Sequence, residues 1–346
     1  MMKCFDPSMA IHRRQNWIRV ARWVFVAVVS SWTVPANARA DDRYANLRTD
    51  KYLGAVEIAA TVESKKFFTE GPAADAQGDL YFTNVYANQI LKFTVKDRTL
   101  TVAREDSNAA NGLAFDQMGM LLACEGGTED RGRVTRIDLK SGKSMTLTEN
   151  FHGQPLGAPN DLCLDAAGRI YFTSRSAKPE IANVNSVYRI DLDGKVSQIL
   201  AAPDIDMPNG IEVTADGKWL YLVESDGRAD RSRCIKRYEL HRDGSVGKMH
   251  VLIDFYPGRS GDGLCVDSDG NLYIAAGLNQ TRSSSETLDT KPGIHVFTPE
   301  GKLVGYVATP EDTITNCAFG GPDRRTLFVT CSKYLLQIPA KIGGMK

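Results

Sequence analysis

A short sequence pattern recurs six times along the chain and limits the folds that it can adopt. Each copy begins with Glu, Asn or Asp, continues as an alternating apolar segment, turns at Gly and Asp, and ends in a segment rich in Leu, Tyr, Phe and Val. The copies begin at the following residues, here called the anchor residues: Glu70, Asn111, Asn160, Asn209, Asp262 and Asn316. Successive anchor residues are 41, 49, 49, 53 and 54 positions apart. A period of this length is typical of β-propeller blades.

The segments that follow each copy favour the same architecture. One or two further strand-like segments complete most units, and clusters such as D-G-K and E-G-K supply hairpin turns. Helical periodicity of useful length is absent after the first forty residues. We therefore predict an all-β, six-bladed β-propeller with about four strands in each blade. Two packed β-sandwiches with chance similarity are the alternative, and six repeats in register disfavour it.

The two ends of the repeat array predict how the ring closes. The last unit, from Asn316 to about Ala340, is too short for four strands. Residues 54–62 (GAVEIAATV) precede the first anchor residue and have no unit of their own. We expect this N-terminal strand to close the last blade by pairing in the same sheet as residues 326–337. Closure removes the open sheet edges of a partial ring.

Residues 1–40 have the features of a secretory signal peptide. Five basic residues precede a short apolar segment at residues 23–34, and Ala38 and Ala40 form an A-x-A cleavage pattern. The apolar segment is short for a membrane span. We expect residues 41–346 to form a single exported propeller domain, periplasmic or secreted, with no stable membrane span. An uncleaved membrane anchor is the alternative.

Charge and cysteine content exclude several classes of function. Lys and Arg together number 42, as do Asp and Glu, and the leader contains six of the basic but one of the acidic residues. The mature chain is therefore slightly acidic, which disfavours nucleic-acid binding. Six cysteines follow the leader without a C-x-x-C pair, and those in apolar segments, such as Cys163 and Cys265, are expected to be buried free thiols. We assign no disulfide.

The anchor residues predict a cation site. The first strand of a propeller blade lines the central channel, so a sixfold repeat brings the six anchor side chains together around one mouth of it. Two carboxylates and four amides without Lys or Arg among them are costly to cluster unless a cation lies between them. A divalent cation with oxygen ligands, best matched by Ca²⁺, is expected. Mg²⁺ is an alternative, and Zn²⁺ fits less well because no anchor residue is His or Cys.

Four tripeptides around the anchor residues resemble one family. Glu-Gly-Pro at Glu70, Pro-Asn-Asp at Asn160, Pro-Asn-Gly at Asn209 and Gly-Asp-Gly at Asp262 resemble the metal-ligand motifs of the senescence-marker-protein/gluconolactonase (regucalcin-like) family. Residues 121–125 (LLACE) and 315–321 (TNCAFGG) resemble its bacterial gluconolactonase branch. The resemblance extends from Glu70 to about residue 344. It implies calcium held by these four anchor residues, and lactone hydrolysis.

The chain departs from the family at two positions. Animal relatives have a substrate-contacting Arg two residues before the Asn of the Asn-Asp motif, where this chain has Ala158. The bacterial Cys-Glu-His pattern becomes Cys124, Glu125 and Gly126. Asn111, Asn316 and Glu125 are expected to line the channel or contact substrate.

The sequence predicts a calcium-dependent hydrolase of a small carboxylic ester, most simply a sugar lactone such as gluconolactone, acting as a monomer or dimer. The cation would polarise the carbonyl while Asp262, or failing it Glu70, Glu125 or Glu224, activates water. A non-catalytic exported propeller that binds a partner or carbohydrate, and a related esterase or phosphotriesterase, are the alternatives. The chain lacks G-x-S-x-G and H-E-x-x-H motifs. Its histidines avoid the anchor positions and are expected in loops or at the surface; after the leader they are His152, His241, His250 and His295.

Overall fold

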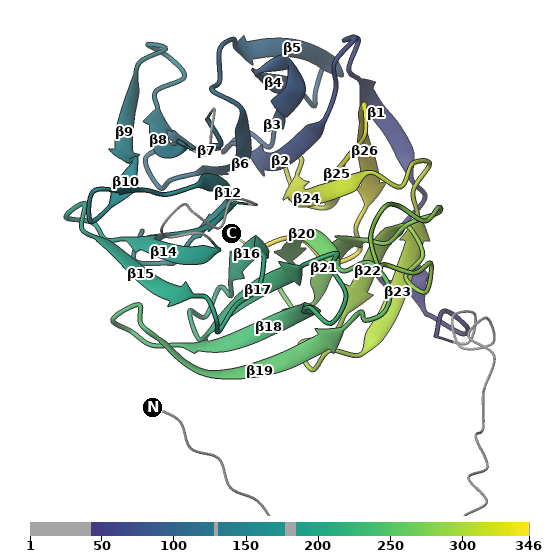
Figure 1. Cartoon of the computed structure of the whole chain (residues 1–346). Helices are drawn as coiled ribbons and strands as arrows, with labels where there is room; N and C mark the ends of the chain where they lie inside the picture. The colour runs from purple at the N-terminus through teal and green to yellow at the C-terminus, as the bar shows by residue number, and fades with distance from the viewer. Residues whose placement is uncertain (1–42, 128–130, 177–184, 346) are drawn as a thin grey trace, which may run out of the picture. The chain divides into compact units, whose positions relative to one another are not determined.

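Six four-stranded antiparallel sheets surround a central axis in a computed structural model of the chain (Figure 1). They belong to one unit, Ala36–Lys346, of which the structure describes residues 43–127, 131–176 and 185–345. This arrangement is the predicted six-bladed β-propeller. The predicted signal peptide, residues 1–40, lies outside the described residues.

The first three blades follow one another along the chain, each with its strands in sequential order. The first consists of β2 (Thr69–Ala74), β3 (Leu80–Asn84), β4 (Gln89–Thr94) and β5 (Thr99–Arg104). The second consists of β6 (Ala110–Phe115), β7 (Leu121–Glu125), β8 (Arg133–Ile137) and β9 (Ser144–Thr148). A small hairpin of β10 (Asn150–Phe151) and β11 (Gln154–Pro155) follows. The third blade consists of β12 (Ala158–Leu164), β13 (Ile170–Arg175), β14 (Ser186–Ile190) and β15 (Val196–Ala201).

The next blades repeat this order until the ring closes. The fourth consists of β16 (Pro208–Val213), β17 (Trp219–Ser225), β18 (Arg233–Leu240) and β19 (Val246–Asp254). The fifth consists of β20 (Gly261–Val266), β21 (Leu272–Ala276), β22 (Gly293–Phe297) and β23 (Leu303–Ala308). The sixth consists of β24 (Ile314–Gly320), β25 (Thr326–Cys331), β26 (Tyr334–Pro339) and β1 (Glu57–Thr61).

The closure of the ring confirms the expectation for residues 54–62. Strand β1 pairs antiparallel with β26, with Glu57 opposite Gln337 and Thr61 opposite Tyr334. The N-terminal strand therefore forms the outer edge of the blade that the C-terminal strands begin, beside β26 in Figure 1. Residues from both ends of the domain must come together before this blade is complete.

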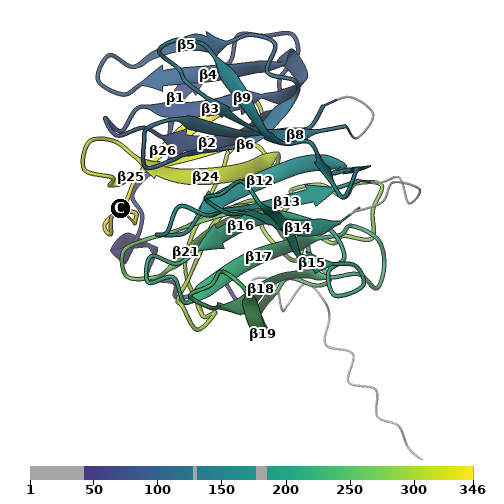
Figure 2. The same ribbon diagram turned by 90° about the vertical axis from the view of Figure 1, so that its left-hand side faces the viewer.

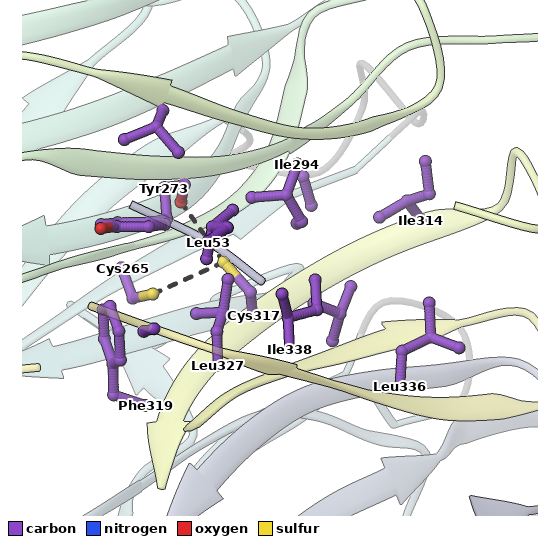
Figure 3. Close-up of a cluster of buried hydrophobic side chains, with 14 of the residues drawn as sticks. Leu53, Cys265, Tyr273, Ile294, Ile314, Cys317, Phe319, Leu327, Leu336 and Ile338 are labelled. Carbon is purple, nitrogen blue, oxygen red and sulfur yellow. Dashed lines mark hydrogen bonds between the residues drawn. The ribbon is translucent and has the colours of Figure 1, made fainter. Parts of the chain in front are cut away.

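The hydrophobic core lies between the blades. The structure contains six clusters of buried apolar side chains, and each joins two neighbouring sheets. Figure 3 shows the cluster between the fifth and sixth blades, where Tyr273 and Phe319 pack edge to face with ring centroids 5.1 Å apart. Such packing excludes water from the interfaces between neighbouring blades and holds the inner strands at fixed positions.

The six cysteines after the leader are buried and free, as expected for Cys163 and Cys265. The sulfur atoms of Cys265 and Cys317 lie 3.5 Å apart in the seam shown in Figure 3, too far for a covalent bond. Burial raises the pKa of the Cys265 thiol well above its usual range. These cysteines therefore behave as small apolar side chains in the core.

The described residues contain two helices, the short 3₁₀ turns η1 (Thr49–Lys51) and η2 (Val85–Ala87). No described helix has the length and apolar character needed to cross a membrane. Figure 2 shows the same strands turned by 90°.

The expectation that the histidines lie in loops or at the surface is wrong for His295. This residue lies in the middle of β22 and is buried. The hydroxyl of Tyr44 lies 2.9 Å from Nε2 of His295. Burial lowers the pKa of His295 to about 3. The N-terminal segment covers this ring, so a neutral histidine is part of the core there.

Candidate cation and active site

The anchor residues lie where each inner strand departs from regular pairing. In all six inner strands, the pairing with the second strand of the blade shifts by one residue at or beside the anchor residue. In the third blade, for example, Pro159 pairs with Ser174 and Leu162 with Phe172, which leaves Asn160 and Asp161 unpaired. A β-bulge of this kind re-aims side chains. The repeat therefore carries a distortion at the same end of every inner strand.

Small residues allow the bulges to approach one another closely. A Cβ added to Gly112 would lie 2.7 Å from the carbonyl oxygen of Asn160 and 2.6 Å from Oδ1 of Asp161. A Cβ on Gly263 would overlap the side-chain amide of Asn316. Glycine is therefore required after these anchor residues because the next blade occupies the space of a side chain.

Asp161 is one of two exceptions to this glycine pattern, and the only acidic one; it was not among the predicted site residues. The residue after the anchor residue is Gly in four blades, Cys317 in the sixth and Asp161 in the third. The Asp161 carboxylate accepts hydrogen bonds from the Leu162 backbone N–H at 2.9 Å and the Asn316 amide at 3.3 Å. The departure from glycine was the sequence signal that could have identified it.

Three carboxylates from three different blades influence one another at this end of the channel. Burial raises the pKa of Glu70 well above its usual range, and the negative charges of Asp262 and Asp161 raise it further. Burial also raises the pKa of Asp161 to about 6. The side chains of Glu70, Asp161 and Asp262 are all buried. This concentration of acceptor groups favours either bound protons or a bound cation.

Two of the anchor amides present oxygen atoms without a donor. Asn209 donates its Nδ2 hydrogens to Asp262 Oδ1 at 2.6 Å and to Ser225 Oγ at 3.0 Å. No described residue donates a hydrogen bond to its Oδ1. The buried side chain of Asn160 makes no hydrogen bond with any described residue. Buried amide oxygens are normally satisfied, so both are suited to a ligand.

The donor set fits a hard divalent cation. Carboxylate oxygens of Glu70 and Asp262 and amide oxygens of Asn160 and Asn209 are the ligand types that Ca²⁺ prefers. No group of three or more His, Cys, Asp or Glu side chains among the described residues is arranged to hold a metal ion. A cation at this mouth would therefore depend on the asparagine oxygens as well as the carboxylates.

The other predicted site residues have different surroundings. Asn316 lies in the same group, because its amide contacts Asp161. The carbonyl oxygen of Asn111 accepts a hydrogen bond from the Thr83 hydroxyl of the first blade at 3.0 Å, and Asn111 is partly buried. Both stand on inner strands, β6 and β24.

Glu125 and Glu224 are engaged elsewhere. Glu125, at the end of β7, receives Arg133 at 2.6 Å, Thr135 at 2.8 Å and Asn108 at 3.1 Å. Glu224 of β17 forms a buried ion pair with Lys236 at 2.8 Å. These contacts hold the two carboxylates in the second and fourth blades.

A cavity of about 1060 Å³ occupies the channel beyond the anchor residues. Its lining includes Asp161 and Asn316. It also includes the residues of the inner strands that come after the anchor residues, and the turns in which those strands end. Asp161 and Asn316 therefore border an open cavity rather than a solid core.

The chain belongs to the SMP-30/Gluconolactonase/LRE-like family, whose model matches residues 68–333. It is 25% identical to a gluconolactonase of Zymomonas mobilis over 327 residues, which covers 86% of this chain and 85% of the relative. It is also 25% identical to a 6-deoxy-6-sulfogluconolactonase of Pseudomonas putida over 257 residues, covering 73% and 79% of the two chains.

Solved structures show the same fold. A gluconolactonase from Xanthomonas campestris superposes with a TM-score of 0.67 at 28% identity, covering 82% of this chain and 89% of that structure. Regucalcin from Agrobacterium tumefaciens, described as a calcium-binding protein, gives a TM-score of 0.68 at 21% identity, covering 84% and 95%. The latter identity supports the fold alone.

Proposed function

We propose that this protein is a divalent-cation-dependent hydrolase of a sugar lactone such as gluconolactone, with Ca²⁺ as the cation. The observation that carries the proposal is the group formed by Glu70, Asp161 and Asp262 with the donor-free oxygens of Asn160 and Asn209. The names of relatives support it, because gluconolactonase, sulfogluconolactonase and pentonolactonase all denote enzymes that open lactones.

Four anchor residues would hold the cation: Glu70, Asn160, Asn209 and Asp262. When bound, the cation supplies Lewis-acid polarisation of the substrate carbonyl. Asn209 has a second role, since its Nδ2 hydrogen bond at 2.6 Å orients the Asp262 carboxylate. The buried position of these side chains limits competing water.

Asp262 is our candidate for the general base. It would accept a proton from the water that adds to the lactone carbonyl; the ring C–O bond then breaks, giving a carboxylate and a hydroxyl group. Arg259 Nη2 donates a hydrogen bond to its Oδ2 at 3.2 Å and so orients this carboxylate. Among the acids considered from sequence, Glu125 and Glu224 are less suitable because their hydrogen bonds go to residues outside the proposed ligand set, whereas Asp262 accepts one from Asn209.

We further propose that the mature protein is exported to the periplasm or secreted, which rests on the leader pattern in residues 1–40. Expression of the full chain with its leader, followed by cell fractionation and N-terminal sequencing, tests this. A mature N-terminus near Asp41 in the exported fraction is expected. A full-length chain retained in the cell would contradict it.

The test of the activity uses purified protein and a panel of sugar lactones, followed by acid release at constant pH. Turnover is expected with Ca²⁺, to be lost with a chelator and to return when Ca²⁺ is restored; Mg²⁺ and Zn²⁺ are compared in parallel. A simple phosphotriester and an aryl ester are included in the panel. Chelator-resistant hydrolysis, or preference for the phosphotriester, would contradict the proposal.

A further inference from the structure

An arginine from the third blade stands beside the anchor residues. Arg175 is the last residue of β13, and its Cα partner in the sheet is Ala158, the first residue of β12. Ala158 precedes the anchor residue Asn160 by two positions. The neighbouring strand thus supplies an arginine opposite the small residue at this mouth of the channel. Its side chain is partly buried.

The charge of Arg175 acts on the site. Its positive charge interacts with the Glu70 carboxylate. Glu70 stands on β2 of the first blade, whereas Arg175 stands on β13 of the third. The guanidinium therefore exerts its charge across the mouth of the channel rather than only on its own blade.

The guanidinium of Arg175 has no acceptor in the described part of the chain: no described residue forms an ion pair or hydrogen bond with it. Three other arginines in segments at this end are paired. Arg133 binds Glu125, Arg259 binds Asp262, and Arg282 binds Asp312. Arg175 thus retains five N–H donors in a fixed planar arrangement.

A partly buried, unpaired guanidinium next to a hydrolytic site suits one kind of substituent. Its planar donors match the paired oxygens of a carboxylate, sulfonate or phosphate, and such charge-assisted bonds are stronger than those to neutral hydroxyl groups. A neutral sugar would leave this charge without a counterion in the bound state.

We propose that Arg175 binds an anionic substituent of the substrate, so that the preferred substrates are lactones of acidic sugars. This inference rests on the proposed lactonase function. It places the acidic group of the substrate on the third-blade side of the mouth, while the ester carbonyl lies at the anchor residues.

The test compares kcat/KM for matched substrates in Ca²⁺: glucono-1,5-lactone as the neutral member, and the glucaro-lactone and 6-phospho- and 6-sulfo-gluconolactones as the anionic members. Wild-type protein is expected to prefer at least one anionic lactone. In Arg175→Gln the ratio of anionic to neutral kcat/KM should fall by about tenfold to a hundredfold, as expected for loss of a hydrogen bond to a charged group. Arg175→Lys should give an intermediate ratio because it keeps the charge but loses the planar donors.

Arg242→Gln is the matched control, since it removes an exposed arginine from the turn between β18 and β19 at the other end of the strands. Its ratio should equal that of wild type. A wild-type ratio near one, or an equal loss for neutral and anionic lactones in Arg175→Gln, would overturn the inference while leaving the lactonase function intact.

A second measurement separates this inference from the proposed function. Calorimetric titration with 6-phosphogluconate and with gluconate should show tighter binding of the phosphate by wild type, lost in Arg175→Gln. If no lactone is hydrolysed, the lactonase proposal fails, and this titration alone decides whether Arg175 forms an anion site. Equal affinity of wild type and variant for 6-phosphogluconate would overturn it.

Discussion

The two ends of the channel are built from the same six strands but differ in chemistry. At the anchor end, every inner strand carries a bulge, and the charges of Asp161 and Asp262 raise the pKa of Glu70. At the far end the pairing is regular, and the cavity wall includes apolar residues such as Ile211 and Leu264. The comparison shows that a local change in pairing, repeated six times, converts one end of an ordinary sheet wall into a polar site.

The far end is also covered by the chain itself. The Ser268 backbone N–H donates to the Gly343 carbonyl at 2.8 Å, and the Gly344 N–H donates to the Arg324 carbonyl at 3.0 Å. Met345 lines the cavity. Glu212 lines the cavity at this end; loss of hydration raises the pKa of Glu212 to about 8, and the charge of Arg324 opposes the increase. This end thus holds one carboxyl group with a raised pKa, whereas the anchor end combines several interacting carboxylates with amide oxygens.

The largest effect on turnover is expected when Asp262, the proposed general base at the anchor end, is changed. Asp262→Asn should lower turnover by about two to four powers of ten, because an amide cannot accept a proton near neutral pH. The comparison is made at saturating Ca²⁺ with metal content measured directly. Glu212→Gln is the matched control at the other end and should keep wild-type turnover. Near-normal turnover of metal-loaded Asp262→Asn would show that Asp262 is only a ligand.

The amide oxygens provide the next test. Asn160→Ala should weaken Ca²⁺ binding by about tenfold or more, since it removes one oxygen from the proposed ligand set. Isothermal titration of chelator-treated protein measures the change. Asn111→Ala is the control, because it changes an anchor residue outside this set. Unchanged affinity in Asn160→Ala together with weaker binding in Asn111→Ala would require a different ligand set.

Asp161 is expected to have a smaller influence. Asp161→Asn should weaken Ca²⁺ binding by about a factor of ten, the equivalent of one pKa unit of lost charge interaction. The variant should also lower the pKa of Glu70, because one of the negative charges that raises it is gone. Difference infrared spectroscopy of the carboxyl groups in metal-free protein follows this pKa. A stronger effect on turnover than that of Asp262→Asn would make Asp161 the better candidate for the base.

The smallest effect is expected at the far end and concerns stability. The pKa of Glu212 is about 8 in the folded protein, whereas the usual pKa of a glutamate is about 4.5. Between these two pH values Glu212 is protonated when folded and ionised when unfolded, so unfolding releases a proton. The free energy of unfolding should therefore fall as the pH rises through this window. Glu212→Gln should remove that part of the decline and raise Tm at pH 8, by about 2–4 °C for each kcal/mol gained. Thermal unfolding from pH 5 to pH 9 checks this, and parallel profiles for wild type and variant would contradict it.

The sequence by itself determined the architecture. Six anchor residues at regular spacing predicted six blades, and the short last unit with the unassigned residues 54–62 predicted the closure between β1 and β26. The reason is physical: alternating apolar strands of this period cannot bury their faces except against neighbouring blades, and open edges are unfavourable. The same register predicted that Glu70, Asn209 and Asp262 lie at one mouth; in the structure Asn209 donates a hydrogen bond to Asp262, and the charge of Asp262 raises the pKa of Glu70.

Only the tertiary structure decided which neighbouring groups join them. Asp161 joins the anchor residues because a bulge leaves it and Asn160 without partners in the sheet. In a regular strand, the side chains of two consecutive residues would point to opposite faces of the sheet. Glu125 is held by Arg133 within its own blade, and Arg175 reaches the mouth from a second strand. These outcomes depend on contacts between residues far apart along the chain, which spacing within one repeat does not encode. The repeat specifies where the inner strands stand, but the packing of each blade decides which charges remain unpaired at their ends.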